Sequence, residues 1–130
     1  MEKQQLPRFL ADENTSHRLV SACGHLVESF PIVHIASWQG GSWLGLDDVA
    51  LLVSCGAEGL ILVAFDRATL PWHAGQVVRA GDDYAGLVLF RRAVRSTNCG
   101  QQAQLLTQFW TDEGQTWDWR NRIVYLPKTP

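Results

Sequence analysis

The sequence has few cysteines, little net charge and no long hydrophobic run, and each of these absences excludes a class of protein. Its three cysteines are Cys23, Cys55 and Cys99, and no two of them form the CxxC pair of a small zinc site. No apolar stretch approaches the roughly 20 residues that cross a membrane. The first residues, MEKQQLPRFLADEN, lack the apolar segment of a signal peptide. We therefore expect a reduced, cytoplasmic protein with no membrane segment.

The formal net charge is only −2, so the chain as a whole has no strong attraction for nucleic acid. Nucleic-acid binding would need a local basic patch. Hydrophobic residues make up 46% of the chain and charged residues 18%, which is typical of a folded globular protein. The length of 130 residues fits one domain. We expect a single domain over residues 1–130, with its core over about residues 8–127.

Short apolar segments alternate with helix-like segments along the chain. The unbroken apolar run Leu60–Phe65 suits a strand that is covered on both faces, as in a parallel sheet. The other expected strands are Arg8–Ala11, Ile32–Ala36, Gly86–Phe90 and Arg122–Leu126. Helices are expected over Ser16–Phe30, from Asp47 to a glycine stop at Gly56, and over Gln101–Trp110. A helix after Pro71 is plausible within Thr69–Arg79. This alternation predicts an α/β sheet with helices on its faces.

Acidic residues stand where strands end or helices begin. Asp12 follows the first expected strand, Asp66 follows the strand Leu60–Phe65, and Asp47 or Asp48 opens a helix. The carboxyl ends of parallel strands share one edge of the sheet, and functional sites gather there. Clustered carboxylates repel one another unless a hard cation such as Mg²⁺ or Mn²⁺ binds them. The other interpretation is that Asp47 is only a helix cap and that Asp66 belongs only to a turn.

The segment Phe9–Asn14 (FLADEN) introduces a family resemblance. The chain resembles the PIN-like domains that are classed as predicted nucleases of toxin–antitoxin systems. The features that match, in order, are the strand running into Asp12-Glu13-Asn14, the loop and helix start Gly45-Leu46-Asp47-Asp48-Val49, the strand ending at Asp66, the following Thr69-Leu70-Pro71, and the ending Trp119–Pro127. The resemblance implies a PIN-like three-layer α/β/α sandwich with a mainly parallel sheet of four to five strands.

The resemblance also assigns roles to residues of this chain. It implies a catalytic set of Asp12, Asp47, Asp48 and Asp66, in which Asp12, Asp48 and Asp66 hold Mg²⁺ or Mn²⁺. Supporting roles fall to Glu13, Asn14 and Thr69. Apart from the resemblance, five arginines are candidates for phosphate contacts, and a solvated face is the alternative for each: Arg67, Arg79, Arg91, Arg92 and Arg95. We choose Arg67, which adjoins the expected site, and Arg91, which follows a strand, as the phosphate-binding residues. The four histidines lack HxxxH spacing and are interpreted as structural or surface groups, with the alternative for His73, seven residues after Asp66, that it reaches the site.

Three positions depart from the family pattern. Ala64 replaces a threonine, Phe65 replaces a residue that is often His or Asn, and Ala68 replaces a fourth acidic residue. Two hypotheses therefore remain open. The first is a metal-dependent endoribonuclease that acts as the toxin of a toxin–antitoxin pair, with RNA as substrate, a small helix-turn-helix antitoxin as partner and self-association as a homodimer. The second is a degenerate PIN-like domain that binds RNA or protein without cutting.

Overall fold

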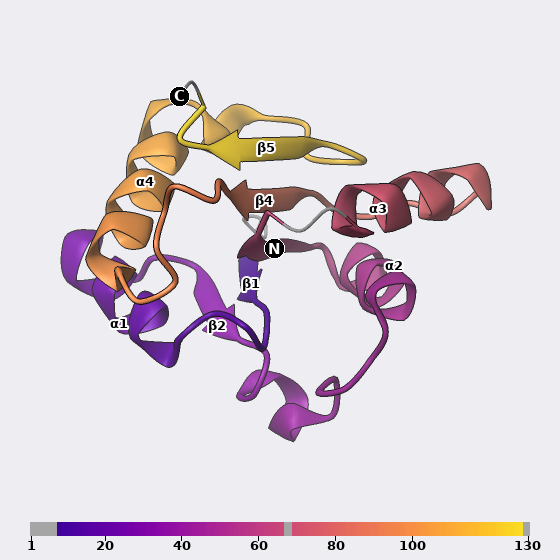
Figure 1. Cartoon of the computed structure of the whole chain (residues 1–130), viewed down its shortest axis with the longest axis horizontal. Coiled ribbons are helices and arrows are strands. Elements are labelled where there is room, and N and C mark those ends of the chain that lie inside the picture. Colours follow the sequence, from indigo (N-terminus) through magenta and orange to yellow (C-terminus); the bar gives the residue numbers. More distant parts are fainter. Residues whose placement is uncertain (1–7, 67–68, 129–130) are drawn as a thin grey trace, which may run out of the picture.

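The computed structural model of the protein describes residues 8–66 and 69–128. Within this part, strands and helices alternate strictly along the chain, as the sequence predicts (Figure 1). The strands are β1 (Arg8–Ala11), β2 (Ile32–His34), β3 (Leu60–Phe65), β4 (Leu87–Phe90) and β5 (Ile123–Leu126). The helices are α1 (His17–Leu26), α2 (Asp48–Glu58), α3 (Thr69–Arg79) and α4 (Cys99–Asp112), with short 3-10 turns η1 (Trp38–Gly41) and η2 (Gly114–Thr116).

The five strands form one sheet in the order β2-β1-β3-β4-β5, and every neighbouring pair is parallel. This is the strand order of flavodoxin-type doubly wound sheets. From β1 the chain moves outward to β2, and it then returns past β1 to β3. The switch point lies between β1 and β3, where the loops that leave the two strands diverge.

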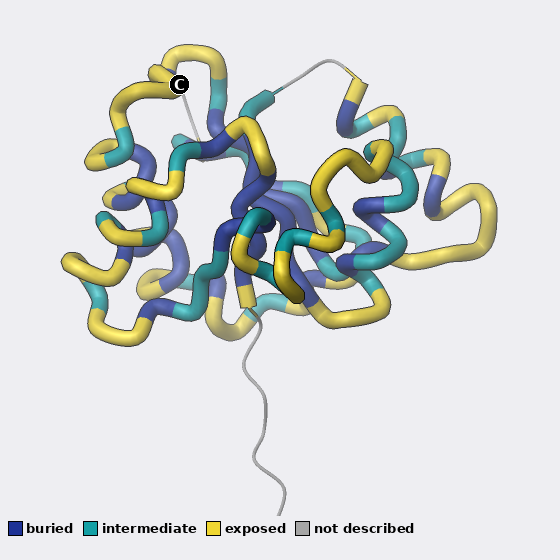
Figure 2. Tube along the Cα trace, turned by 90° about the horizontal axis from the view of Figure 1, so that it is seen from below, coloured by how far each residue is buried: buried dark blue, intermediate teal, exposed yellow. Residues whose placement is uncertain are grey.

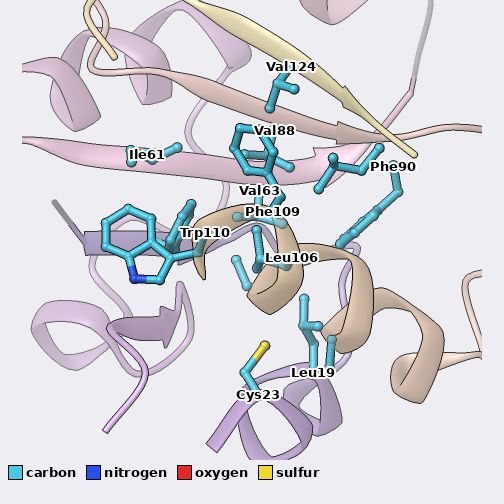
Figure 3. Close-up of a cluster of buried hydrophobic side chains, with 14 of the residues drawn as sticks. Leu19, Cys23, Ile61, Val63, Val88, Phe90, Leu106, Phe109, Trp110 and Val124 are labelled. Carbon is cyan, nitrogen blue, oxygen red and sulfur yellow. The ribbon is translucent and has the colours of Figure 1, made fainter. Parts of the chain in front are cut away.

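Helices cover both faces of the sheet (Figure 1), which confirms the expected three-layer α/β/α sandwich. The side chains of β3 alternate between the faces: Ile61 and Val63 pack under α1 and α4, and Leu62 packs under α2 and α3. Figure 3 shows the first of these two cores, and Figure 2 shows that buried residues line the central strands and the inner sides of the helices. Burial on both faces explains the unbroken apolar run in β3.

One crossover differs in hand from the others. Strands β3, β4 and β5 step in one direction across the sheet, yet α3 and α4 cover opposite faces. The crossovers β3-α3-β4 and β4-α4-β5 therefore have opposite hands. The hand of a crossover reverses when either the direction of its step or the face that its helix covers is reversed. The crossover through α2 has the same step and face as the one through α3, and the crossover through α1 reverses both, so all three have the same hand. The segment after β4 must consequently carry the chain over to the face of α1.

Side-chain caps start α1 and α4; α1 begins where the sequence indicates, and α4 begins at Cys99, two residues before the expected start at Gln101. Ser16 accepts a hydrogen bond from the backbone N–H of Arg18 at the start of α1, and Asn98 accepts one from Gln101 at the start of α4. The expected end of α1 at Phe30 is wrong, because the backbone is already extended at Val27 and left-handed at Ser29, with φ of 60°. The chain therefore leaves the helix before Pro31.

The expected stop of α2 at Gly56 is also wrong. Helix α2 continues to Glu58 and ends at Gly59, which has the left-handed conformation, φ 69° and ψ 32°, that suits a C-terminal glycine. Gly56 serves instead as a point of close approach. A Cβ built on it would clash with the backbone carbonyl oxygen of Asp83, in the segment that leads into β4.

The remaining boundaries shift by a few residues. Helix α3 fills the whole uncertain segment, with Pro71 in its first turn, where the missing N–H costs no hydrogen bond. Strand β2 ends at His34 and not at Ala36, and β4 begins one residue after Gly86. No helix of the described residues is long and apolar enough to span a membrane.

Candidate functional site

The carboxyl ends of β1 and β3 lie side by side at the switch point. The register pairs Ala11 with Val63, and the backbone N–H of Asp12 donates to the Val63 carbonyl over 3.0 Å. Asp12 is therefore level with Ala64, while Asp66 lies two residues farther along its strand. At about 3.3 Å per residue, this offset is about 7 Å along the strand direction.

Asp12 is held in place by the turn that follows β1. Its side chain is buried, and one carboxylate oxygen, Oδ1, accepts the backbone N–H groups of Asn14 and Thr15, each over 3.1 Å. The Thr15 hydroxyl donates to the Asp12 carbonyl over 2.6 Å. Such a turn fixes the direction of the carboxylate before any ligand arrives.

A pocket of about 260 Å³ opens beside this turn, and we call it the acidic pocket. Asp12 and Asp48 line it from opposite layers, because the turn after β1 leads into α1 and Asp48 begins α2. The backbone N–H of Gly45 donates to Glu13 Oε1 over 3.2 Å and thereby joins the loop before α2 to the turn after β1. The lining residues are Asp12, Glu13, Asn14, Gly45, Leu46, Asp48 and Leu51.

The two neighbouring aspartates at the start of α2 have different positions. Asp47 is the N-cap: its exposed carboxylate accepts the backbone N–H of Ala50 over 2.8 Å. Asp48 lies in the first turn and lines the acidic pocket. The sequence leaves open which of the two aspartates is a site residue. In the structure Asp47 caps the helix and Asp48 lines the pocket.

His73 joins this region from α3, although it is not among the predicted site residues. Its Nε2 lies 3.8 Å from Asp48 Oδ2, and both side chains are about one-quarter exposed. Its Nδ1 is buried and has no hydrogen-bond partner within the described chain. Only the packing of α3 against α2 brings His73 here, and that contact leaves no local pattern in the sequence.

Asp66 lines a second pocket, of about 480 Å³, which we call the basic pocket. The backbone N–H of Asp66 donates to the Phe90 carbonyl over 2.8 Å, so the residue is anchored beside the end of β4. The basic pocket is lined by Phe65, Asp66, Phe90, Arg92, Val94, Arg95, Ser96 and Thr97. Asp66 does not line the acidic pocket. The predicted carboxylates are thus divided between neighbouring pockets at one edge of the sheet.

Three other predicted residues have different surroundings. Thr69 is the exposed first residue of α3. Arg91 donates through Nε to the Pro127 carbonyl over 2.6 Å and through a terminal nitrogen to the Lys128 carbonyl over 3.0 Å, so its guanidinium is engaged within the fold. Arg67 lies outside the described residues. The phosphate-binding roles of Arg67 and Arg91 stay predictions.

The histidine and cysteine side chains near the core have structural surroundings. His34 Nδ1 accepts the N–H of Ala36 over 3.1 Å, which leaves Nε2 as the donor to the Thr15 carbonyl over 2.8 Å. Burial raises the pKa of the Cys23 and Cys55 thiols to about 12. These thiols stay protonated at neutral pH and are therefore neither nucleophiles nor metal ligands there.

The acidic pocket has the donor chemistry that a hard cation requires. Its side chains supply carboxylate and amide oxygens, and Mg²⁺ is commonly held by one or two carboxylates while it keeps several waters. Within residues 8–66 and 69–128, no group of three or more His, Cys, Asp or Glu side chains is placed to hold a metal ion. The residues present fit a cation held by Asp12 and Asp48 with water, and the predicted third ligand, Asp66, stays a prediction.

Comparisons with known proteins identify no relative: no protein-family model, no curated protein and no solved structure matches the chain.

Proposed function

We propose that this protein is a Mg²⁺- or Mn²⁺-dependent phosphodiesterase that cuts RNA. The observation that carries the proposal is the acidic pocket, in which Asp12 and Asp48 meet from opposite layers at the switch point of a doubly wound sheet. Ligand sites of such sheets lie outside the carboxyl ends of the strands at this point. A basic pocket beside the acidic one adds groups that suit a phosphate.

In this mechanism Asp12 and Asp48 hold the cation, with Glu13 and Asn14 beside them. The cation supplies Lewis-acid polarisation of the phosphate group and of water. The residues of the chain contribute orientation. The backbone N–H groups of Asn14 and Thr15 hold Asp12 in one direction, and Gly45 holds Glu13. His73 Nε2 lies 3.8 Å from Asp48 Oδ2 and so borders this carboxylate.

The choice of RNA as substrate rests on the sequence resemblance to PIN-like nucleases. The same resemblance supports a role as the toxin of a toxin–antitoxin pair, held inactive by a small helix-turn-helix antitoxin, and self-association as a homodimer. The carboxylates at the end of β1 and at the start of α2 are the features that the resemblance and the geometry share.

The test is cleavage of a labelled single-stranded RNA with Mn²⁺ or Mg²⁺. Asp12→Asn and Asp48→Asn should each slow cleavage by about 100-fold or more, because each removes a charge from the acidic pocket. Asp82→Asn is the matched control, since Asp82 is exposed in the segment between α3 and β4. Circular dichroism checks the folding of each variant. Equal cleavage by all four proteins would rule the mechanism out.

A second candidate is a PIN-like domain that binds RNA without cutting it. Two observations favour it: Asp66 lines the basic pocket and not the acidic one, and Ala64 brings no ligand to the end of β3. Calorimetric titration with Mn²⁺ separates the candidates. Binding that disappears in Asp12→Asn and Asp48→Asn supports the enzyme. Absence of Mn²⁺ binding, together with intact RNA binding, supports the second candidate.

A further inference from the structure

The basic pocket contains arginines that the fold itself does not use. Within the described chain, the side chains of Arg92 and Arg95 make no hydrogen bond or ion pair, although both line the same pocket. Asp66, which shares the pocket, has no such partner there either. The pocket therefore holds two positive groups and one negative group, in a chain whose formal net charge is −2. It is the local concentration of arginine that nucleic-acid binding by this chain requires.

Three other arginines of the described chain have partners. Arg120 lies 3.6 Å from Asp83, and Arg122 lies over the Trp117 ring, 3.7 Å from its centroid. Arg91 is engaged by the carbonyls of the C-terminal segment. These contacts use the guanidinium groups to hold the protein together. Arg92 and Arg95 make no such contact within the described residues and lie in one pocket, so both are available for a ligand.

The backbone of the loop that carries the two arginines is held by hydrogen bonds from α4. Gln102 of α4 is fully buried, and its Nε2 donates to the carbonyl of Arg95 over 2.8 Å and to that of Ser96 over 3.2 Å. The N–H of Asn98 also donates to the Arg95 carbonyl over 3.1 Å. A loop held in this way presents its side chains with a reduced entropy cost on binding.

The rest of the pocket fits a nucleotide. Ser96 and Thr97 add hydroxyl donors beside the arginines, and Thr97 directly precedes the cap of α4. Phe65 forms part of the wall, partly exposed, and packs on the buried Phe90 with ring centroids 5.7 Å apart. A partly exposed ring on a fixed support is a surface on which a base can stack.

We propose that the basic pocket holds one nucleotide of a single-stranded RNA, with its phosphate on Arg92 and Arg95 and its base against Phe65. The inference rests on the proposed function, because it makes this nucleotide a neighbour of the phosphodiester that is cut at the acidic pocket. The ends of β1 and β4 are separated by β3, so the two pockets lie about two strand spacings, or about 10 Å, apart across the sheet edge.

The test measures binding without cleavage. Fluorescence anisotropy follows a labelled single-stranded RNA in EDTA, with the full chain, over a series of salt concentrations. Arg92→Ala/Arg95→Ala should weaken binding by about 10- to 100-fold, because two charge-assisted phosphate contacts disappear. The dependence of log K on log salt should become shallower by about 0.7, the value for one neutralised phosphate on a single strand.

Two controls make this result specific. Arg79→Ala/Arg120→Ala removes the same charge at the opposite edge of the sheet, where α3 ends and β5 begins, and should change the affinity less than threefold. Arg92→Lys/Arg95→Lys keeps the charge and loses the planar fork, so its affinity should fall between those of the wild type and the double alanine variant. Equal losses in both double alanine variants, an unchanged salt dependence, or no RNA binding by the wild type would each overturn the proposal.

A further variant separates this proposal from the proposed function. Asp12→Asn should abolish cleavage and should bind RNA in EDTA within twofold of the wild type. If the wild-type protein binds RNA through Arg92 and Arg95 but never cuts it, the proposed enzymatic function is refuted and the proposed nucleotide pocket is supported. If cleavage depends on Asp12 but neither cleavage nor RNA binding depends on the two arginines, the enzymatic function is supported and the nucleotide pocket is refuted. Displacement of the RNA by an equal concentration of a nucleoside 5′-monophosphate would show a free-nucleotide site and would also overturn the proposal.

Discussion

Gly56 offers a sharp test of how α2 is positioned. A glycine inside a helix usually costs about 1 kcal/mol relative to alanine, so Gly→Ala in a helix normally stabilises a protein. At Gly56 an added Cβ would clash with the Asp83 carbonyl oxygen and lie 3.2 Å from Tyr84 Cα. Both neighbours are backbone atoms and cannot rotate away. We expect overpacking to cost about 2–3 kcal/mol, which outweighs the gain in helix propensity.

The expected result is that Gly56→Ala lowers the free energy of unfolding by about 1–2 kcal/mol, which corresponds to a melting temperature lower by about 4–8 °C. Gly24→Ala in α1 is the matched control, because a Cβ there meets nothing within 4 Å. It should raise stability by about 0.5–1 kcal/mol. Urea unfolding followed by tryptophan fluorescence measures both variants. A Gly56→Ala protein as stable as Gly24→Ala would refute the close approach of α2 to the segment before β4.

Three more predictions concern the site and the core. Asp47→Ala should lower the free energy of unfolding by about 1 kcal/mol and leave Mn²⁺ affinity within twofold. Asp48→Asn should weaken Mn²⁺ binding and leave the free energy of unfolding nearly unchanged. Urea unfolding and calorimetry measure the two quantities, and similar effects of both variants on either quantity would contradict the prediction. Between about pH 9 and pH 11 the unfolded chain releases thiol protons that buried Cys23 and Cys55 retain, so stability should fall with rising pH by up to about 1.4 kcal/mol per pH unit for each thiol. Cys55→Ala should remove its share of that slope, measured by urea unfolding at stepped pH, and an unchanged slope would argue against a buried thiol there. Gln102→Ala should cost about 1–3 kcal/mol, because it removes one of the two donors to the Arg95 carbonyl and the donor to the Ser96 carbonyl, and it should speed hydrogen exchange across residues 91–98; an unaltered exchange rate would show that the loop does not depend on this amide.

The layer architecture follows from local patterns in the sequence. The apolar run of β3 and the cap residues Ser16 and Asp47 are short-range signals, and each predicts its element directly. Gly56 shows what such signals miss. A glycine near the end of an apolar helix looks like a stop, and only the distant segment at Asp83 explains why it lies inside α2. Close contacts between segments far apart in sequence have no local pattern.

The same limit applies to the candidate site. The sequence places Asp12 and Asp66 at one sheet edge, but the register that offsets them along the strands is a property of the pairing. The sequence does not decide which of Asp47 and Asp48 lines the site, because a cap and a first-turn position are adjacent in sequence and point in different directions. His73 reaches Asp48 only because two helices pack together. Arg92, for which the sequence leaves a phosphate contact and a solvated face open, lies in a pocket with a second arginine.

The crossover of opposite hand keeps Arg92 and Arg95 apart from Asp48 at the edge of the sheet. Because the chain leaves β4 for the layer of α1 and α4, residues 91–98 carry Arg92 and Arg95 toward that layer, whereas Asp48 comes from the layer of α2 and α3. A crossover of the common hand would lead this loop to the layer of Asp48 and bring opposite charges together. As built, the two arginines approach the edge from the layer opposite to that of Asp48, so that carboxylate does not neutralise them and their positive charge can attract an anionic ligand.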